Sequence, residues 1–371
     1  MPWRSPRLPV HTSLPLPSKV QQIDGVQVLR AVAVILVAWT HSGQNVGSPR
    51  GLLDFGIFGV DIFFVISGFI LSSVVLRERG GPGVRTMGAF LKRRLLRIFP
   101  VYWFFALLTL VRFAWAHQPL ARGHLYSFFL LPSFTHLRTP LIVAFSWTLV
   151  FEMFFYYTLA LVLLKTVRLA VPVMIALLTA AVITGNLFGI RHPVWIVLCN
   201  PILLEFVLGA IVALVYARFK KLRVLGWGMT LLGTALVIYL AAYTPAAAAN
   251  SQQAVMEGVG VLGRVMTWGV AAVLIVGGGV FWSPSLNSRI GRIFVALGTA
   301  SYSAYLASPI VIELVSRLLY KLHGAPASTL SFALYKCLMV AAVLGLGWLC
   351  YDLIEWPLIR RLQTKFLHKA A

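Results

Sequence analysis

The sequence predicts an all-α, polytopic integral membrane protein with about ten transmembrane helices and both termini in the cytoplasm. Hydrophobic residues make up 59% of its 371 residues and charged residues only 11%, which is typical of membrane-embedded proteins and not of soluble ones. Apolar runs of spanning length recur along the chain with short connections between them. The net charge of +22 is spread over alternate connections. That distribution is the topology signal of a multi-pass protein, and it argues against a nucleic-acid-binding domain.

Ten apolar spans are predicted, and the lysines and arginines are concentrated in every second connection. The positive-inside rule therefore places both termini inside. Residues 1–25 are expected to form a basic, Pro-rich cytoplasmic tail, 26–357 a single transmembrane domain, and 358–371 a basic cytoplasmic C-terminal tail. The ten predicted spans are 26–44, 56–76, 98–116, 145–164, 170–189, 194–217, 225–243, 259–281, 293–316 and 331–354.

The first span carries two ionisable residues, Arg30 and His41, in an otherwise apolar stretch. A separation of eleven residues at about 100° each brings both side chains to one helix face, about 16 Å apart along the axis. The charge pattern places Arg30 near the cytoplasmic end and His41 near the outer end. Ionisable residues inside a span are costly and therefore indicate function. The alternative is that Arg30 snorkels to the lipid surface and His41 sits at the far interface.

Two acidic residues, Asp61 in the second span and Glu152 in the fourth, are predicted to lie at the depth of His41. Neither has a basic partner nearby in the sequence. A carboxylate beside a histidine orients the ring and stabilises the imidazolium that forms when the ring takes a proton from a hydroxyl. Asp61 or Glu152 is therefore expected to orient His41. For Glu205, which follows a Pro in the sixth span, structural and functional roles are equally compatible with the sequence.

The connection before the third span ends in a basic run, Lys92-Arg93-Arg94, followed by Arg97. Arg94 and Arg97 are three residues apart at the predicted helix start and project from one face. Such clusters commonly set orientation and bind anionic lipid headgroups. Guanidinium groups also match phosphate oxygens, so the same residues suit a clamp for a phosphorylated donor. The residues alone leave both interpretations open.

No pattern typical of a metal site or a disulfide is present. The three cysteines lie in apolar segments, and the histidines of the longest outer connection lack ligand spacing. No metal is therefore expected. No serine stands in a G-x-S-x-G context, so a Ser-His-Asp arrangement is not predicted.

Five sequence blocks, taken in order, resemble the acyltransferase-3 family of membrane-bound O-acyltransferases, which acylate bacterial polysaccharides. Within that family, the compact chain is similar to the O-acetyltransferases of exopolysaccharide clusters, including the ExoZ-like branch. One departure is Ala307-Ser308, which stand where the family's ninth-span block has a histidine. The blocks are LRAVAVILVAWTHSG with Arg30 and His41, GVDIFFVISGFIL at 59–71, RRLLRIFPVYW at 93–103, SWTLVFEMFFYY at 146–157 and EWPLIRRL at 355–362.

The resemblance implies a bundle of about ten helices in the bacterial inner membrane that moves an acetyl group from cytoplasmic acetyl-CoA to a glycan hydroxyl outside. The acceptor would be an exopolysaccharide, a surface glycan or a lipid-linked sugar, and an association with polysaccharide biosynthesis machinery is left open. His41 would be the catalytic histidine, with Asp61 or Glu152 beside it. The CoA-binding residues would be Arg30, Arg93, Arg94 and Arg97.

Two other classes of function remain open. In a proton-coupled secondary transporter, the same His, Asp and Glu would relay protons, but such a protein is expected to show paired halves with inverted topology, and the sequence shows none. The other class is a non-catalytic subunit of a polysaccharide export complex. The sequence does not determine the acceptor sugar, the acyl group, or whether His41 acts as a general base or carries the acyl group transiently.

Overall fold

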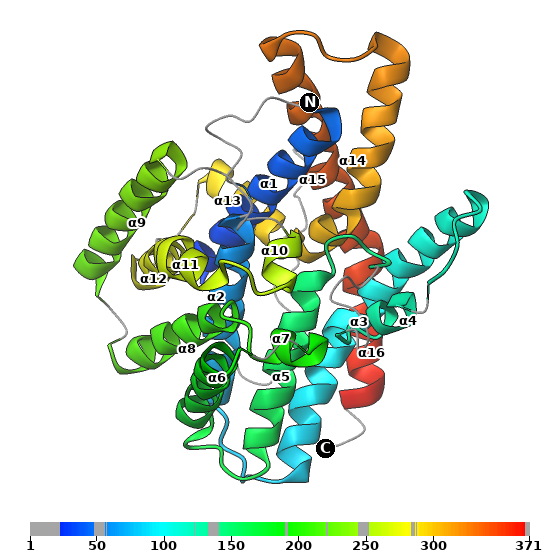
Figure 1. Ribbon diagram of the computed structural model, residues 1–371. Helices are drawn as coiled ribbons and strands as arrows, with labels where there is room; N and C mark the ends of the chain where they lie inside the picture. Colours follow the sequence, from blue (N-terminus) through cyan, green and yellow to red (C-terminus); the bar gives the residue numbers. More distant parts are fainter. Residues whose placement is uncertain are drawn as a thin grey trace, which may run out of the picture.

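The computed structural model of the protein is an α-helical bundle, as the sequence predicts (Figure 1). Within the residues it describes, the regular elements are α-helices and short π-helices, and no strand is found among them. The predicted tail at 1–25 lies almost wholly outside these residues, and the division into one transmembrane domain and two tails stays a prediction. The described residues are 23–47, 58–121, 123–132, 141–189, 192–219, 222–243, 252–282 and 288–367, together with Gly56 and Leu286.

The helices follow one another with short connections. In chain order they are α1 (Asp24–Val46), α2 (Phe58–Val75), α3 (Val84–Trp115), α4 (Gly123–Phe128), α5 (Trp147–Leu163), α6 (Ala170–Leu187), α7 (Pro193–Leu198), α8 (Leu203–Arg218), α9 (Arg223–Tyr243), α10 (Gln252–Met256), α11 (Val261–Arg264), η2 (Val265–Gly269), α12 (Val270–Trp282), α13 (Arg289–Thr299), α14 (Ser301–His323), α15 (Thr329–Cys350), η3 (Tyr351–Glu355) and α16 (Trp356–Leu367).

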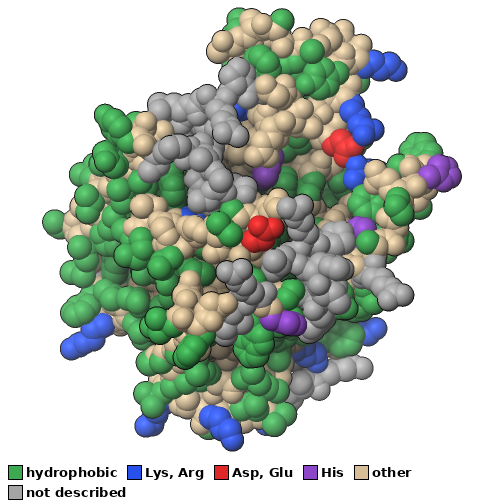
Figure 2. Space-filling model, viewed as in Figure 1, with side chains coloured by type: hydrophobic (Ala, Val, Ile, Leu, Met, Phe, Trp, Pro, Cys, Tyr) green, Lys and Arg blue, Asp and Glu red, His purple; other side chains and the backbone are tan. Residues whose placement is uncertain are grey.

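Nine helical segments among the described residues are long and apolar enough to cross a membrane. The helix α5, with 17 residues, is shorter but apolar, and it occupies the predicted span at 145–164. Figure 2 shows apolar side chains spread over the region of α6, α8 and α9, with several lysines and arginines toward the lower edge of the view. The protein is therefore a multi-pass membrane protein, and its orientation stays a prediction from the charge pattern.

The third and ninth predicted spans differ from the structure in their boundaries. The third span was expected to begin at residue 98, but α3 begins at Val84 and runs for 32 residues, so the basic run lies inside a helix and not in a loop. The ninth predicted span, 293–316, is divided at Ala300 between α13 and α14. The short helix α13 is amphipathic and packs against α1, which explains why its apolar face resembles part of a span.

The helices α1 and α2 lie at the centre of the bundle, where α1 contacts α2, α12, α13, α14 and α15. The helix α2 packs closely on α8 because Gly68 has no side chain there. A Cβ atom added at Gly68 would lie 2.1 Å from the carbonyl oxygen of Phe206. The helices α5 and α14 contact this central pair, and α3 packs against α5 and α14. Their inward faces enclose the cavity that holds the candidate site.

Candidate active site

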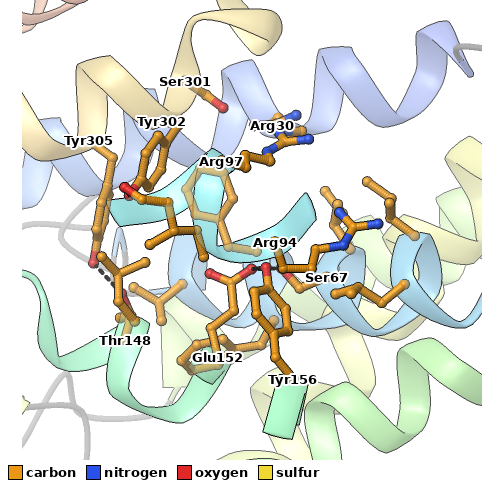
Figure 3. Close-up of a pocket in the computed structure, with 18 residues that line it drawn as sticks. Arg30, Ser67, Arg94, Arg97, Thr148, Glu152, Tyr156, Ser301, Tyr302 and Tyr305 are labelled. Atoms are coloured by element: carbon orange, nitrogen blue, oxygen red, sulfur yellow. Dashed lines mark hydrogen bonds between the residues drawn. The ribbon is translucent and has the colours of Figure 1, made fainter. Parts of the chain in front are cut away.

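A cavity of about 100 Å³ lies between α1, α2, α3, α5 and α14 (Figure 3). Polar and basic side chains line one part of it, and aromatic and aliphatic side chains line the rest. Its residues are Arg30, Val60, Phe63, Phe64, Ile66, Ser67, Ile70, Leu71, Arg94, Arg97, Ile98, Thr148, Leu149, Glu152, Tyr156, Ser301, Tyr302 and Tyr305.

Three arginines from two helices converge on this cavity. Arg30 comes from α1, whereas Arg94 and Arg97 are three residues apart on α3 and share a face because the helix continues through the basic run. The side chains are close enough for Arg97 to repel both Arg30 and Arg94 electrostatically. Like charges held together in a membrane interior require compensating anions, so this part of the cavity is suited to a negatively charged ligand.

The carboxylate of Glu152 lies among these arginines. It accepts hydrogen bonds from the Ser67 hydroxyl at 3.1 Å and from the Tyr156 hydroxyl, and it attracts Arg30 and Arg94 electrostatically. Tyr156 stands four residues after Glu152 on the same helix face, and this spacing can be recognised in the sequence.

A second carboxylate, that of Glu355, reaches the same arginines from the end of η3. It accepts a hydrogen bond from the Ser303 hydroxyl at 2.5 Å and attracts Arg30 and Arg97. Glu355 is buried and belongs to the EWPLIRRL block, to which the sequence alone assigned no role. Three guanidinium groups thus face two carboxylates, which leaves one positive charge in excess around the cavity.

Arg93, the fourth predicted donor-binding residue, does not line the cavity. Its guanidinium pairs with Glu78 at 3.8 Å, and both side chains are about one-third exposed. The residue projects from α3 in a direction about 100° away from Arg94, since the two are adjacent in a helix. A role for Arg93 in binding a donor stays a prediction that this arrangement does not favour.

His41 lies outside the cavity lining, on the same helix as Arg30. Its Nδ1 atom is 2.9 Å from the Oε1 atom of Gln44, and its ring stacks on Phe145 with the ring centroids 3.9 Å apart. A carbonyl oxygen only accepts hydrogen bonds, so with this amide orientation Nδ1 carries the proton and Nε2 keeps its lone pair. Gln44 is one turn after His41, and that spacing could have identified it from the sequence.

Within the described residues no carboxylate contacts His41, so the orienting role of Asp61 or Glu152 stays a prediction that this arrangement does not favour. Glu152 is five residues beyond Trp147, the first residue of α5, or about 7.5 Å along the helix axis from it. Its carboxylate interacts with Arg30 and Arg94, which places it at the level of the arginines. The role of orienting the ring falls to Gln44 instead.

Asp61 forms a buried ion pair with Arg264, which lies at the end of α11. The Arg264 Nε and Nη2 atoms donate to the two carboxylate oxygens at 2.9 and 2.8 Å. The cavity-lining residues of α2 begin with Val60, and Asp61 is rotated by about 100° from it, toward α8. Glu205 of α8 is buried beside this pair and interacts with both partners. Asp61 thus belongs to a separate cluster.

A short series of contacts connects the cavity with His41. Tyr305 lines the cavity, and its hydroxyl donates to the carbonyl oxygen of Phe145 at 2.9 Å. The Phe145 ring is the one that stacks on His41. Ser308, at the position where the acyltransferase-3 pattern departs in this chain, donates its hydroxyl to the Tyr305 carbonyl at 2.7 Å. The residues around this departure therefore support Tyr305 within α14.

No group of three or more His, Cys, Asp or Glu side chains that could hold a metal ion is found in the described part of the chain. The expectation that the protein needs no metal stays a prediction. The cavity contains no such ligand set, and its polar residues suit an organic anion better than a cation.

Comparison with known proteins identifies one family match and several relatives. The acyltransferase domain family matches residues 23–352. The exopolysaccharide production protein ExoZ of Rhizobium meliloti (strain 1021) is 31% identical over 341 residues, covering 86% of this chain and 94% of ExoZ. The "Putative O-acetyltransferase SACOL0978" of Staphylococcus aureus (strain COL) is 37% identical over 82 residues, covering 22% of this chain and 13% of that protein. No solved structure matches the chain.

Proposed function

Because the chain belongs to the acyltransferase-3 family of membrane proteins, we propose that it transfers an acetyl group from cytoplasmic acetyl-CoA to a hydroxyl of an exopolysaccharide or another surface glycan. The observation that carries the proposal is the pairing of a cavity lined by three arginines with a histidine about three helical turns away on α1. The charge pattern predicts that the arginines lie toward the cytoplasm of a bacterial inner membrane and that His41 lies toward its outer face.

The donor is proposed to bind at the arginines. Arg30, Arg94 and Arg97 offer forked donors that match the phosphate oxygens of CoA, and the excess positive charge favours an anion. The aromatic and aliphatic part of the cavity, beside the arginines, offers an apolar surface along which the pantetheine arm could lie. An arm extended from the arginines toward Tyr305 would bring the thioester near His41. Glu152 and Glu355 would hold the arginines in position.

His41 is proposed to act on the acceptor. The Nε2 atom takes the proton of the sugar hydroxyl as the hydroxyl oxygen forms a bond to the thioester carbonyl carbon. The carbon–sulfur bond then breaks, the CoA sulfur leaves with the electron pair, and it takes up a proton to give the free thiol. Gln44 keeps the imidazole in the tautomer that this role requires. If the acyl group is instead carried on the histidine, the same Nε2 atom is the nucleophile.

The proposal is tested with membranes that contain the protein, labelled acetyl-CoA and an acceptor glycan. His41→Ala is expected to lower transfer to the glycan by about 10²-fold or more, the range of general acid–base catalysis. The matched control is His323→Ala, which replaces an exposed histidine at the end of α14 and should leave transfer unchanged. Transfer at the wild-type rate by the His41→Ala protein would show that the assignment is wrong.

A further inference from the structure

Two aromatic side chains stand between the cavity and His41. Tyr305 forms part of the cavity wall, and Phe145 stacks on the imidazole of His41. The two rings have their centroids 6.0 Å apart, and both side chains are buried. The described contacts that lead from the cavity to His41 thus pass through Tyr305 and Phe145.

The position of Phe145 depends on side-chain hydrogen bonds. Phe145 precedes the first residue of α5 and lies in an irregular segment, so the hydrogen-bond ladder of a helix does not hold it. Its carbonyl oxygen accepts from the Tyr305 hydroxyl at 2.9 Å and from the Thr148 hydroxyl at 3.2 Å. The Tyr305 and Thr148 oxygen atoms are themselves 3.0 Å apart. Losing the hydroxyl of one tyrosine would leave the Phe145 carbonyl with the Thr148 bond alone and would loosen the segment that carries Phe145.

The cavity wall at this end is apolar and aromatic. Phe63 packs edge-on against Tyr305 with ring centroids 6.0 Å apart, and Val60 lines the cavity on the same face of α2. Phe63 and Val60 offer no donor or acceptor to a ligand, and the Tyr305 hydroxyl is already bonded to the Phe145 carbonyl and Thr148. The arginines line another part of the cavity. The wall therefore accommodates a short apolar group and limits its length by steric contact.

We propose that Phe145 and Tyr305 form a movable aromatic partition that separates the donor cavity from His41 and restricts the transferred group to a short acyl chain. That the cavity holds an acyl donor rests on the proposed function. The partition itself concerns only whether molecules can pass between the cavity and His41. A closed partition keeps water on the His41 side away from a bound thioester, and an opened one lets the thioester carbonyl meet Nε2. Tyr305 acts here as a positioning residue, through Phe145.

Access is tested by cysteine labelling, which does not depend on catalysis. Val60→Cys is introduced after the three native cysteines, Cys199, Cys337 and Cys350, have been replaced by serine or alanine. Membrane vesicles are treated with a charged, membrane-impermeant thiol reagent from each face in turn. A separate His41→Cys protein identifies the face from which the histidine is reached, so the test does not assume an orientation.

The cysteine at position 60 is expected to react slowly from the His41 face when the partition is intact. In the Phe145→Ala background its labelling should become about tenfold faster, because the ring contact that closes the path is gone. Tyr305→Phe, which keeps the ring and removes one hydroxyl, should give a smaller increase that arises from the lost hydrogen bonds. Phe145→Leu is the matched control, since it retains most of the apolar bulk and should label nearly as slowly as the intact protein.

Acyl selection is measured in the same variants with acetyl-, propionyl- and butyryl-CoA, with and without acceptor glycan. Phe145→Ala is expected to raise thioester hydrolysis without acceptor and to narrow the preference for acetyl by about tenfold, the discrimination of one methylene group in an apolar pocket. Equal labelling of position 60 in folded Phe145→Ala and Phe145→Leu proteins, or an unchanged acyl preference despite faster labelling, would overturn the proposal. Faster labelling in a protein that transfers no acyl group would support the access claim and refute the proposed function instead.

Discussion

The helix α2 carries a polar cluster on each of two faces, and the two clusters differ in the sign of their excess charge and in the space beside them. On one face Ser67 adjoins the cavity, where three arginines outnumber two carboxylates and room remains for a ligand. On the other face Asp61 is joined to Arg264 through two hydrogen bonds, and each side chain is only 1% exposed. Both clusters use the same residue types. Buried charge in a membrane protein therefore indicates a binding site only where it adjoins a cavity.

The Asp61 cluster instead ties together helices that are distant in sequence. The ion pair links α2 to the end of α11, and Glu205 brings α8 to the same place. The approach is close: a Cβ atom added at Gly269 of η2 would lie 3.2 Å from a carboxylate oxygen of Glu205. One guanidinium faces two carboxylates here, an arrangement that stays neutral only when one carboxyl keeps its proton. The cluster holds α2 so that its other face meets the cavity.

The largest expected effect comes from breaking this ion pair. Arg264→Met leaves the Asp61 carboxylate buried without its guanidinium and is expected to lower the free energy of unfolding by about 3–5 kcal/mol. The double replacement Asp61→Asn with Arg264→Met removes both charges and should recover much of that loss. Thermal unfolding of the detergent-purified proteins measures both. A double variant no more stable than the single one would show that the pair is not the source of the effect.

The second expected effect concerns the cavity and not the stability of the fold. Arg94→Gln removes a charged donor from the donor site and should weaken binding of CoA by about 1.5–3 kcal/mol, or roughly 10- to 150-fold in its Kd. Arg93→Gln is the matched control, because Arg93 is adjacent in α3 but pairs with Glu78 on the surface. Equilibrium binding of CoA to the purified proteins separates the two. Equal losses from both substitutions would indicate a general effect of surface charge and not a site at the cavity.

The sequence predicts those features of the fold and of the candidate site that depend only on spacing along a single helix. The alternation of apolar and basic segments gave the membrane spans, and the spacing of Arg30 and His41 placed them on one face of α1. Arg94 and Arg97 were expected to share a face, and they do so within the cavity wall. These properties follow from the helical repeat, which a local stretch of residues determines by itself.

The contacts that the sequence does not predict, those of Asp61 with Arg264 and of Tyr305 with Phe145, depend on how the helices are rotated against one another. Depth in the membrane can be counted from a span's end, but the direction in which Asp61 points depends on the packing of α2 against α8. Its partner Arg264 is 203 residues away in the chain. Tyr305 and Phe145 are 160 residues apart and meet for the same reason. Single-sequence periodicity contains no information on such pairs, so the two carboxylates were assigned to His41 on depth alone.

The smallest expected effect concerns the half-buried histidine itself and tests whether its orientation comes from Gln44. Gln44→Ala removes one hydrogen bond, worth about 1 kcal/mol, and should lower kcat by roughly fivefold while leaving the KM for acetyl-CoA unchanged. Gln44→Glu restores an acceptor for Nδ1–H and should recover most of the rate, which a merely structural role of the side chain would not predict. Asn45→Ala, one residue on, removes a hydrogen bond to Ser316 at 2.6 Å instead and should not change kcat if only the imidazole contact matters. A loss of kcat in the Asn45 variant as large as in the Gln44 variant would assign the effect to the end of α1 as a whole, and not to the tautomer of His41.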